Sequence, residues 1–322
     1  MSAPLPPRIT RGRRVWQEVQ RCVTVGHWPA RLARLGGGQR EVGISREVLE
    51  VPGPSAAALR IAFASDFHAG PCTHPRVLDS ACEQLAALKA PVLLLGGDFV
   101  CIAARDIREL APRLADIPAP LGKFAVLGNH DYWAGAGAVT RALEAAGIRV
   151  LVNESVRLAA PFDRVWVCGL DDPIVGHPRA APMLDPAVGR RVVLMHAPSG
   201  LGTLGRARFD LALCGHTHGG QVALPGRRAL LIPESPPFRR YVAGRFALDP
   251  QRTLFVTRGV GYSTAPLRTF CPSEVVGFEL AFGAPAGGSA RAQPASPPHP
   301  RRRALDPRYA ATFPDPYRGS HE

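Results

Sequence analysis

Two histidines stand close together in the stretch from Leu211 to Gly220. An apolar run ends at Gly215, and His216 and His218 follow it, with further glycines behind. This pattern indicates a buried strand whose carboxyl end directs two imidazoles into one site. Imidazole is a common ligand of divalent metals, which take further nitrogen or oxygen ligands from separate segments. A metal site here therefore requires partner residues from elsewhere in the chain.

Four other apolar runs, at residues 59–65, 91–97, 123–128 and 191–195, also end in polar residues. The residues that follow them can bind a metal or transfer a proton: Asp66 and His68, Asp98, Asn129 with His130 and Asp131, and His196. In an extended segment residues two apart face the same side, so Asp66 and His68 can reach one ion. The carboxyl ends of strands are also where α/β sheets bind ligands.

Each of these motifs alone has a simpler interpretation. A single aspartate after a glycine, such as Asp98, is more often a turn former, and His196 alone is more often a histidine of the core. Turn formation, however, does not require a histidine such as His130. Together the candidate ligands combine carboxylate, amide and imidazole groups without a thiolate: Asp66, His68, Asp98, Asn129, His196, His216 and His218. This set suits Mn²⁺, Fe²⁺ or Zn²⁺, and two ions sharing one carboxylate would use all of it.

The apolar runs alternate with stretches of helical periodicity, which predicts an α/β fold. Helices are expected at 75–88, 107–117 and 139–147, and further strands at 148–152, 155–158, 164–169, 253–257 and 274–280. We divide the chain into a basic, partly helical extension at 1–58, a central domain at 59–282, and a Pro/Ala/Arg-rich tail at 283–322 expected to be disordered.

The net charge is +13, and much of the excess arginine lies near the two ends of the chain. Val15, Trp16 and Val19 recur at helical spacing among arginines, which is typical of a helix lying in a membrane interface, although a helix packed on its own domain fits equally well. No run of 18 apolar residues occurs, and we expect neither a membrane span nor a signal peptide. The seven cysteines are scattered and suggest no disulfide framework. We therefore expect a cytoplasmic protein that contacts an anionic membrane through residues 1–50.

The order of these motifs resembles the calcineurin-like metallophosphoesterase superfamily over about residues 60–220. Three stretches are similar to the bacterial branch of this superfamily that contains the YkuE- and YaeI-like phosphodiesterases. They follow Gly215, span Arg258 to Tyr262, and surround Arg268. This branch is related to the UDP-2,3-diacylglucosamine pyrophosphatases. The resemblance implies a four-layer αββα sandwich with two mixed β-sheets. It also implies that residues 59–282 form the metallophosphoesterase domain.

The resemblance further implies a role for each candidate residue. One metal, with Mn²⁺ favoured, would be held by Asp66, His68 and His218, a second by Asn129, His196 and His216, and Asp98 would bridge the two. A hydroxide shared by the metals would attack phosphorus. His130 would protonate the leaving oxygen, and Asp131 would fix the tautomer of His130 through a hydrogen bond.

The expected activity is hydrolysis of a phosphodiester or pyrophosphate bond, with a lipid-linked nucleotide such as UDP-2,3-diacylglucosamine of lipid A synthesis as one substrate. A nuclease or cyclic-nucleotide phosphodiesterase is the alternative, although nucleic acid is disfavoured because the chain has no basic stripe interleaved with aromatic residues. A non-catalytic scaffold is disfavoured because no ligand is missing. Arg258, Tyr262 and Arg268 are candidate substrate contacts. Cys72 and Cys101, close to the ligands in sequence, are interpreted as unreactive.

Overall fold

The structure is a computed structural model that describes residues 12, 15, 18–20, 24–52, 58–226 and 228–283. The described helices are η1 (Val25–His27), α2 (Trp28–Leu35), α3 (Pro75–Ala87), η2 (Ala104–Asp106), α4 (Ile107–Ala115), α5 (Asn129–Ala145), α6 (Ala181–Leu184), α7 (Gly200–Leu204), η3 (His218–Gly220) and η4 (Pro236–Phe238). None of the helices in these ranges has the length and hydrophobicity needed to cross a bilayer. The predicted disordered tail after Gly283, and Trp16 of the predicted amphipathic helix, lie outside the described residues.

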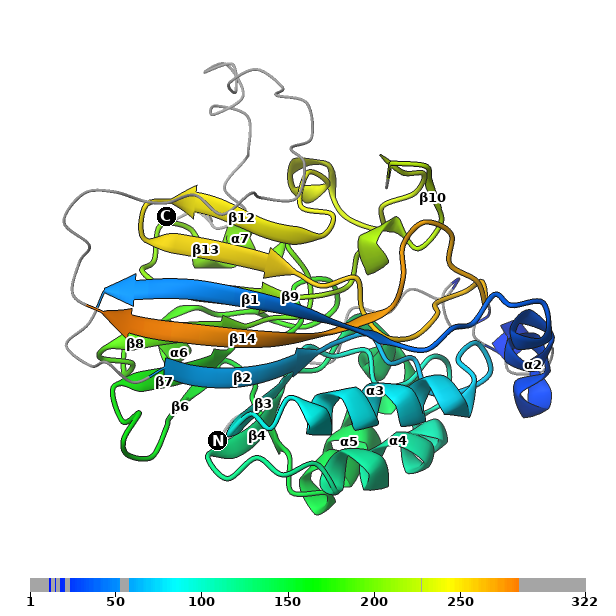
Figure 1. Cartoon of the computed structure of the whole chain (residues 1–322), viewed down its shortest axis with the longest axis horizontal. Helices are drawn as coiled ribbons and strands as arrows, with labels where there is room; N and C mark the ends of the chain where they lie inside the picture. The colour runs from blue at the N-terminus through cyan, green and yellow to red at the C-terminus, as the bar shows by residue number, and fades with distance from the viewer. Residues whose placement is uncertain are drawn as a thin grey trace, which may run out of the picture. The chain divides into compact units, whose positions relative to one another are not determined.

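The first sheet has six strands in the order β1-β14-β2-β3-β4-β5 (Figure 1). They are β1 (Gly43–Pro52), β14 (Glu274–Gly283), β2 (Ala58–Ala64), β3 (Val92–Leu95), β4 (Gly122–Ala125) and β5 (Arg149–Val150). Strands β2 to β5 run parallel, whereas β14 is antiparallel to β2. The carboxyl ends of β2, β3 and β4 therefore meet at one edge.

The second sheet has six strands in the order β12-β13-β9-β8-β7-β6. They are β12 (Gly244–Asp249), β13 (Arg252–Val256), β9 (Leu211–Cys214), β8 (Arg190–Leu194), β7 (Val165–Gly169) and β6 (Glu154–Arg157). Strands β7, β8, β9 and β13 are parallel, and both edge strands are antiparallel to their neighbours. A short hairpin of β10 (Ala223–Leu224) and β11 (Arg228–Ala229) stands apart from both sheets.

The two sheets pack face to face, with helices on their outer sides. Ile61 and Phe63 of β2 join a core cluster that contains Leu194 and Leu213 of the second sheet. The alternate residues of β2, such as Ala62, belong instead to the cluster formed with α3, α4 and α5. This alternation follows from the two-residue period of a strand. The result is the four-layer αββα sandwich with two mixed sheets, which confirms the predicted fold class.

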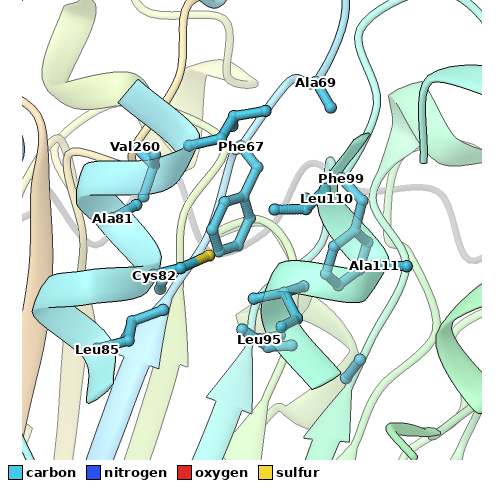
Figure 2. Close-up of a cluster of buried hydrophobic side chains, with 14 of the residues drawn as sticks. Phe67, Ala69, Ala81, Cys82, Leu85, Leu95, Phe99, Leu110, Ala111 and Val260 are labelled. Atoms are coloured by element: carbon cyan, nitrogen blue, oxygen red, sulfur yellow. The ribbon is translucent and has the colours of Figure 1, made fainter. Parts of the chain in front are cut away.

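A phenylalanine follows two of the candidate ligands and anchors each loop in the core. Phe67 and Phe99, which come directly after Asp66 and Asp98, are fully buried and stack with ring centroids 6.0 Å apart. Figure 2 shows both rings among Ala81, Leu85, Leu95, Leu110 and other residues of the layer between the first sheet and its helices. Burial of these two rings fixes the loops from which the neighbouring carboxylates project.

The segment before residue 59 differs from the predicted extension. Residues 43–52 form β1, which pairs in parallel with the whole of β14 at the edge of the first sheet. The strand at residues 43–52 is therefore part of the first sheet, and the predicted separate extension at 1–58 does not describe these residues. Only Val15 and Val19 of the predicted apolar stripe lie among the described residues, and both are exposed.

Candidate metal centre

The loops after β2 and β3 continue the hydrogen bonding of the two strands beyond their ends. The backbone N–H of Asp66 donates to the carbonyl of Gly97 at 2.9 Å, and that of His68 donates to the carbonyl of Asp98 at 3.0 Å. These bonds place Asp66, His68 and Asp98 side by side at the carboxyl edge of the first sheet.

The first group of candidate ligands combines both sheets. Ligand atoms of Asp66, His68 and His218 lie within 4.8 Å of one another. Nε2 of His218 is 3.0 Å from Nε2 of His68 and 3.4 Å from Oδ1 of Asp66. His218, at the start of η3, thus meets two residues that lie about 150 positions earlier in the chain.

The second group contains Asp98, His196 and His216, whose ligand atoms also lie within 4.8 Å of one another. Nε2 of His196 is 3.3 Å from Oδ2 of Asp98 and 3.2 Å from Oδ1 of Asn129. The same Oδ2 of Asp98 is 3.5 Å from Nε2 of His68 in the first group. One carboxylate oxygen therefore lies between the two groups.

These separations fit the residues around two cations. Ligand atoms at roughly 2.0–2.2 Å from one ion lie roughly 3–3.5 Å from each other in tetrahedral or octahedral geometry. The five measured distances have this size. His68 also keeps a buried Nδ1 with no hydrogen-bond partner in the described part of the chain.

Backbone carbonyls orient two of the imidazoles. Nδ1 of His196 donates to the carbonyl of Gly96 at 2.8 Å, so its Nε2 faces Asp98 and Asn129. Nε2 of His216 donates to the carbonyl of Pro233 at 2.5 Å, which leaves Nδ1 as its ligand atom. Such partners on the far nitrogen are typical of metal-binding histidines because they fix the ring and its tautomer.

Burial and neighbouring charges set the protonation of the site. Burial lowers the pKa of His68 and His218, and burial with the nearby His196 lowers that of His216 to about 3. These rings are therefore neutral and able to act as ligands. Burial opposes the charge on Asp98, yet the surrounding imidazoles, His196 foremost, hold its pKa well below the usual range.

The backbone of the candidate ligands is strained. Eleven described non-glycine residues have positive φ, and five of them are Asp66 (58°), His68 (46°), Asp98 (55°), His216 (67°) and His218 (52°). Each such conformation costs on the order of 1–3 kcal/mol and persists where the surrounding fold enforces it, typically at functional sites. Gly128 allows the site to pack this closely, because a Cβ there would overlap Oδ1 of Asp98 and lie 2.7 Å from Cε1 of His196.

His130 lies in the first turn of α5 beside both groups. Its backbone N–H donates to Oδ1 of Asp98 at 2.8 Å, and its ring lies edge-on to that of His68 with centroids 4.6 Å apart. Nδ1 of His130 donates to the carbonyl of Cys101 at 2.6 Å. This carbonyl, and not Asp131 as the sequence predicted, therefore fixes the tautomer.

The carboxylate of Asp131 has a different set of partners. It accepts the backbone N–H groups of Phe99 at 2.9 Å, Val100 at 3.2 Å and Gly128 at 2.9 Å. These bonds tie the loop after β3 to the first turn of α5. Asp131 thus positions the two segments that carry Asp98 and His130.

The three predicted substrate contacts bind other parts of the protein. All five N–H donors of Arg268 meet acceptors: the carbonyls of Gly261 (twice), Arg258 and His218, and Nδ1 of His218 at 3.1 Å. Arg258 pairs with Glu274 and donates to the carbonyl of Pro272. Tyr262 is only 2% exposed, with its ring 5.5 Å from the guanidinium of Arg268.

The loop after β7 was missed by the sequence reasoning. Tyr132 donates its hydroxyl to Asp171, and the buried Asp172 accepts the N–H groups of Ile174 and Val175. The second oxygen of Asp172 has no partner among the described residues, and burial raises its pKa to about 7. The sequence could have indicated this loop by the same pattern that indicated the candidate ligands, because Asp171 and Asp172 follow an apolar strand. Trp133, 4.9 Å from the His130 ring, was also missed.

Comparison with known proteins adds an independent observation. Residues 59–220 match the family described as calcineurin-like phosphoesterase. The chain is 33% identical over 238 residues to "Phosphodiesterase YaeI" of Escherichia coli (strain K12), covering 70% of this chain and 83% of that protein. It is 31% identical over 231 residues to an uncharacterized metallophosphoesterase of Aquifex aeolicus, and the match covers 69% of this chain and 85% of that protein. It is 30% identical over 177 residues to the uncharacterized metallophosphoesterase YkuE of Bacillus subtilis, and the match covers 54% of this chain and 61% of that protein.

Proposed function

This chain belongs to the calcineurin-like phosphoesterase family, and we propose that it hydrolyses a phosphodiester or pyrophosphate bond at a two-metal centre. Membership makes it a phosphoric ester hydrolase. The observation that carries the finer proposal is the position of Asp98, whose Oδ2 lies within 3.5 Å of imidazoles in both ligand groups. A single carboxylate in this position suits a bridge between two cations.

In this proposal Asp66, His68 and His218 hold one ion, Asn129, His196 and His216 hold the other, and Asp98 is shared. Bound divalent cations lower the pKa of water and neutralise charge on a phosphoryl group. The mixed oxygen and nitrogen donors suit Mn²⁺, and also Fe²⁺ or Zn²⁺. His68 and His216 are neutral, as a ligand must be, because an imidazole binds a metal only when unprotonated. Burial opposes a charge on His196, yet Asp98 raises its pKa, so a metal bound there would displace a proton.

The remaining residues orient the substrate and the ligands. His130 is partly exposed beside the buried ligands, so we assign it the proton transfer to the leaving oxygen. Asp131 holds the loops of Asp98 and His130 together. Arg268 binds the backbone carbonyls of Gly261, Arg258 and His218, and these bonds engage its N–H groups within the protein.

Exposed apolar side chains near the metal centre support a lipid-linked substrate. Leu32 and Leu35 of α2 are 60% and 85% exposed, and Leu267 and Phe270 are 40% and 59% exposed. Gln39, which follows α2, donates to the carbonyl of Pro266, so the two apolar segments are neighbours. Figure 1 shows α2 and β10 at the end of the molecule toward which β2 and β13 point. We propose that this apolar rim meets the inner face of an anionic membrane.

A panel of substrates tests the proposal. Purified protein with Mn²⁺ should hydrolyse a simple phosphodiester and a nucleotide pyrophosphate such as UDP-2,3-diacylglucosamine, and a chelator should abolish both reactions. Cyclic nucleotides and single-stranded nucleic acid cover the alternative activities. Metal-independent hydrolysis, or no hydrolysis of any ester, would refute the two-metal proposal.

A variant of the rim separates substrate chemistry from membrane contact. Leu32→Ser combined with Leu35→Ser should retain hydrolysis of a soluble diester and lose activity on a lipid pyrophosphate presented in anionic vesicles. Exposed residues of α2 suit this test, because truncation at residue 50 would remove most of β1 from the first sheet. Equal activity of variant and wild type on vesicles would refute the role of the rim.

A further inference from the structure

A large cavity lies at the opposite end of the second sheet from the metal centre. It has a volume of about 740 Å³, and its lining includes the first residues of β8 and β13 and the residue before β9. In extended chain at about 3.3 Å per residue, Arg190 at the start of β8 lies roughly 20 Å from His196. The cavity is therefore a separate site, and its size is within the usual range of small-molecule pockets, roughly 300–1,000 Å³.

Arginine is the commonest residue in the lining of this cavity. Five arginines line it, namely Arg190, Arg191, Arg206, Arg208 and Arg252. Three carboxylates also line it, those of Glu50, Asp210 and Asp249. Whether the cavity attracts an anion depends on how many of these charges are already balanced within the protein.

Two of the carboxylates are occupied by donors of the protein itself. Asp210 accepts Nη1 of Arg190 at 2.9 Å and the backbone N–H of Arg191 at 2.8 Å. Asp249 accepts Nε of Arg252 at 2.5 Å and the backbone N–H of the same residue at 2.9 Å. These ion pairs balance Arg190 and Arg252, so three arginines and one carboxylate of the lining remain.

The three remaining arginines have no acidic partner among the described residues. The side chains of Arg206 and Arg208 are exposed and form neither a hydrogen bond nor an ion pair within the described ranges. Arg191 is held only by neutral acceptors, since its Nε donates to the carbonyl of Ala187 at 2.7 Å and its Nη1 to the carbonyl of Arg208 at 2.9 Å. The charge of these three guanidinium groups therefore exceeds that of Glu50.

The backbone that carries two of these arginines is held in place from both sides. Arg191 of β8 binds the carbonyl of Arg208, and Arg252 of β13 binds the carbonyl of Gly205 through Nη1 at 2.8 Å. Phe209 is buried, and its ring lies 5.5 Å from the guanidinium of Arg252. A fixed backbone lowers the entropy lost when a ligand is bound by the side chains that it carries.

We propose that this cavity binds an anion that carries two or more linked phosphate groups. The paired N–H donors of a guanidinium match the oxygens of a phosphate, and one phosphate group engages one such pair. Three arginines without an acidic partner therefore favour a chain of phosphates over a single one. Free nucleotides and inorganic polyphosphate both carry such a chain. The site does not depend on the proposed hydrolysis, because it shares no residue with the metal centre.

Titration calorimetry with tripolyphosphate tests the site. The full-length chain is used free of metal, so that the probe cannot bind a cation at the metal centre. Wild type should bind tripolyphosphate saturably, and Arg206→Ala combined with Arg208→Ala should raise the Kd about 100-fold, because each hydrogen bond to a charged group is worth roughly a factor of ten. Arg206→Gln combined with Arg208→Gln removes the charges, keeps long polar side chains, and provides a second variant if the first fails to fold.

Arg76→Ala combined with Arg141→Ala is the matched control. These exposed arginines of α3 and α5 lie outside the lining of the cavity, so the control removes the same charge and should leave the Kd unchanged. An equal rise in the Kd of the control would overturn the proposal, since binding would then reflect net charge alone. Absence of saturable binding by wild type, or an unchanged Kd in both cavity variants, would also overturn it.

Two further ligands define what the cavity recognises. Orthophosphate should bind more weakly than tripolyphosphate, and equal binding would overturn the assignment to linked phosphates. ATP carries the same chain of three phosphates. A Kd for ATP below that for tripolyphosphate, lost in the cavity variants, would identify a nucleotide as the ligand, whereas an equal or higher Kd would identify the phosphate chain itself.

Discussion

The imidazole of His130 is oriented by atoms of the backbone and lies where buried ligands meet solvent. Oδ1 of Asp98 accepts the backbone N–H of His130, the Cys101 carbonyl accepts the ring Nδ1–H, and His68 contacts the ring edge to face. Because Nδ1 carries a proton in this arrangement, Nε2 is the nitrogen that would exchange a proton with substrate in the proposed reaction. In the proposed reaction the residue would act as general acid, and it belongs neither to the group of Asp66, His68 and His218 nor to that of Asp98, His196 and His216.

Replacing His130 should separate proton transfer from metal binding. His130→Ala is expected to lower kcat by about 10²–10⁴, the usual contribution of general acid catalysis, with metal content unchanged. Steady-state kinetics and elemental analysis of the same preparation measure the two effects. His74→Ala, which removes an imidazole from the start of α3, is the control and should keep full kcat. Loss of metal from His130→Ala would show that His130 is a ligand.

At this scale the sequence predicted residue types better than their partners. The seven candidate ligands were found because carboxylates, an amide and imidazoles follow apolar runs, and the structure brings them together. The partner of His130 was not predictable, because a backbone carbonyl is present at every residue and leaves no signal in the sequence. The partners of Arg268 were not predictable for the same reason, since three backbone carbonyls accept four of its hydrogen bonds.

The segment of η1 and α2 is attached to the central fold through His27. Its Nε2 lies 2.9 Å from Glu109 on α4, and its Nδ1 lies 2.8 Å from the carbonyl of Gly70 in the loop after β2. The hydrogen bond with Glu109 raises the pKa of His27 above 6.5, although burial opposes the shift. The protonated ring therefore connects the apolar residues of α2 to the loops of the metal centre.

The raised pKa of His27 predicts a pH-dependent contribution to stability. A group whose pKa is higher in the folded state stabilises that state fully below its unfolded pKa, and the effect is lost as pH rises through the folded value. His27→Ala should therefore lower the free energy of unfolding by about 1–3 kcal/mol below about pH 6.5, the usual worth of hydrogen bonds to a charged group. The difference from wild type should shrink at higher pH.

Urea unfolding of both proteins between pH 5 and about pH 9 measures this difference. Asp106 titrates in the same range, because burial raises its pKa to about 6, and the charge of His27 lowers that pKa, so the difference reports His27 together with this carboxyl. A difference that grows with pH would contradict the charged state assigned to His27.

Element prediction succeeded for the interior strands of both sheets and for the edge strands β5 and β6, and it failed for the other two edge strands. Strands β2, β3, β4, β8 and β9 appear in the sequence as apolar runs because both of their faces are covered. Strands β1 and β12 were missed. Each is an edge strand with many exposed residues, and β1 forms only by pairing with β14, more than 200 positions away. Helix α5 begins at Asn129, earlier than predicted, since its first turn reads as a strand-end motif.

The candidate metal ligands come together where the two sheets meet. The first sheet and the turn after it supply Asp66, His68, Asp98 and Asn129, whereas the loops of the second supply His196, His216 and His218. The bond from His196 to the Gly96 carbonyl crosses between the sheets. Binding of cations should therefore stabilise the packing of the two sheets by mass action.

The order of layers was predicted from the family resemblance, and the match over residues 59–220 agrees with it. Strand order within each sheet was not predictable from the residues alone, because pairings such as β14 with β2 join the two ends of the fold. The periodicity of a strand indicates which face is buried and not which strand lies beside it.

Metal stoichiometry tests the two-metal centre most directly. Metal-free protein saturated with Mn²⁺ and then freed of excess ion should retain two ions per chain by elemental analysis, and Asp98→Asn should retain fewer. His74→Ala, which keeps every candidate ligand, should retain two. One ion per chain in wild type, or two undiminished in Asp98→Asn, would contradict a centre in which Asp98 joins two metal sites.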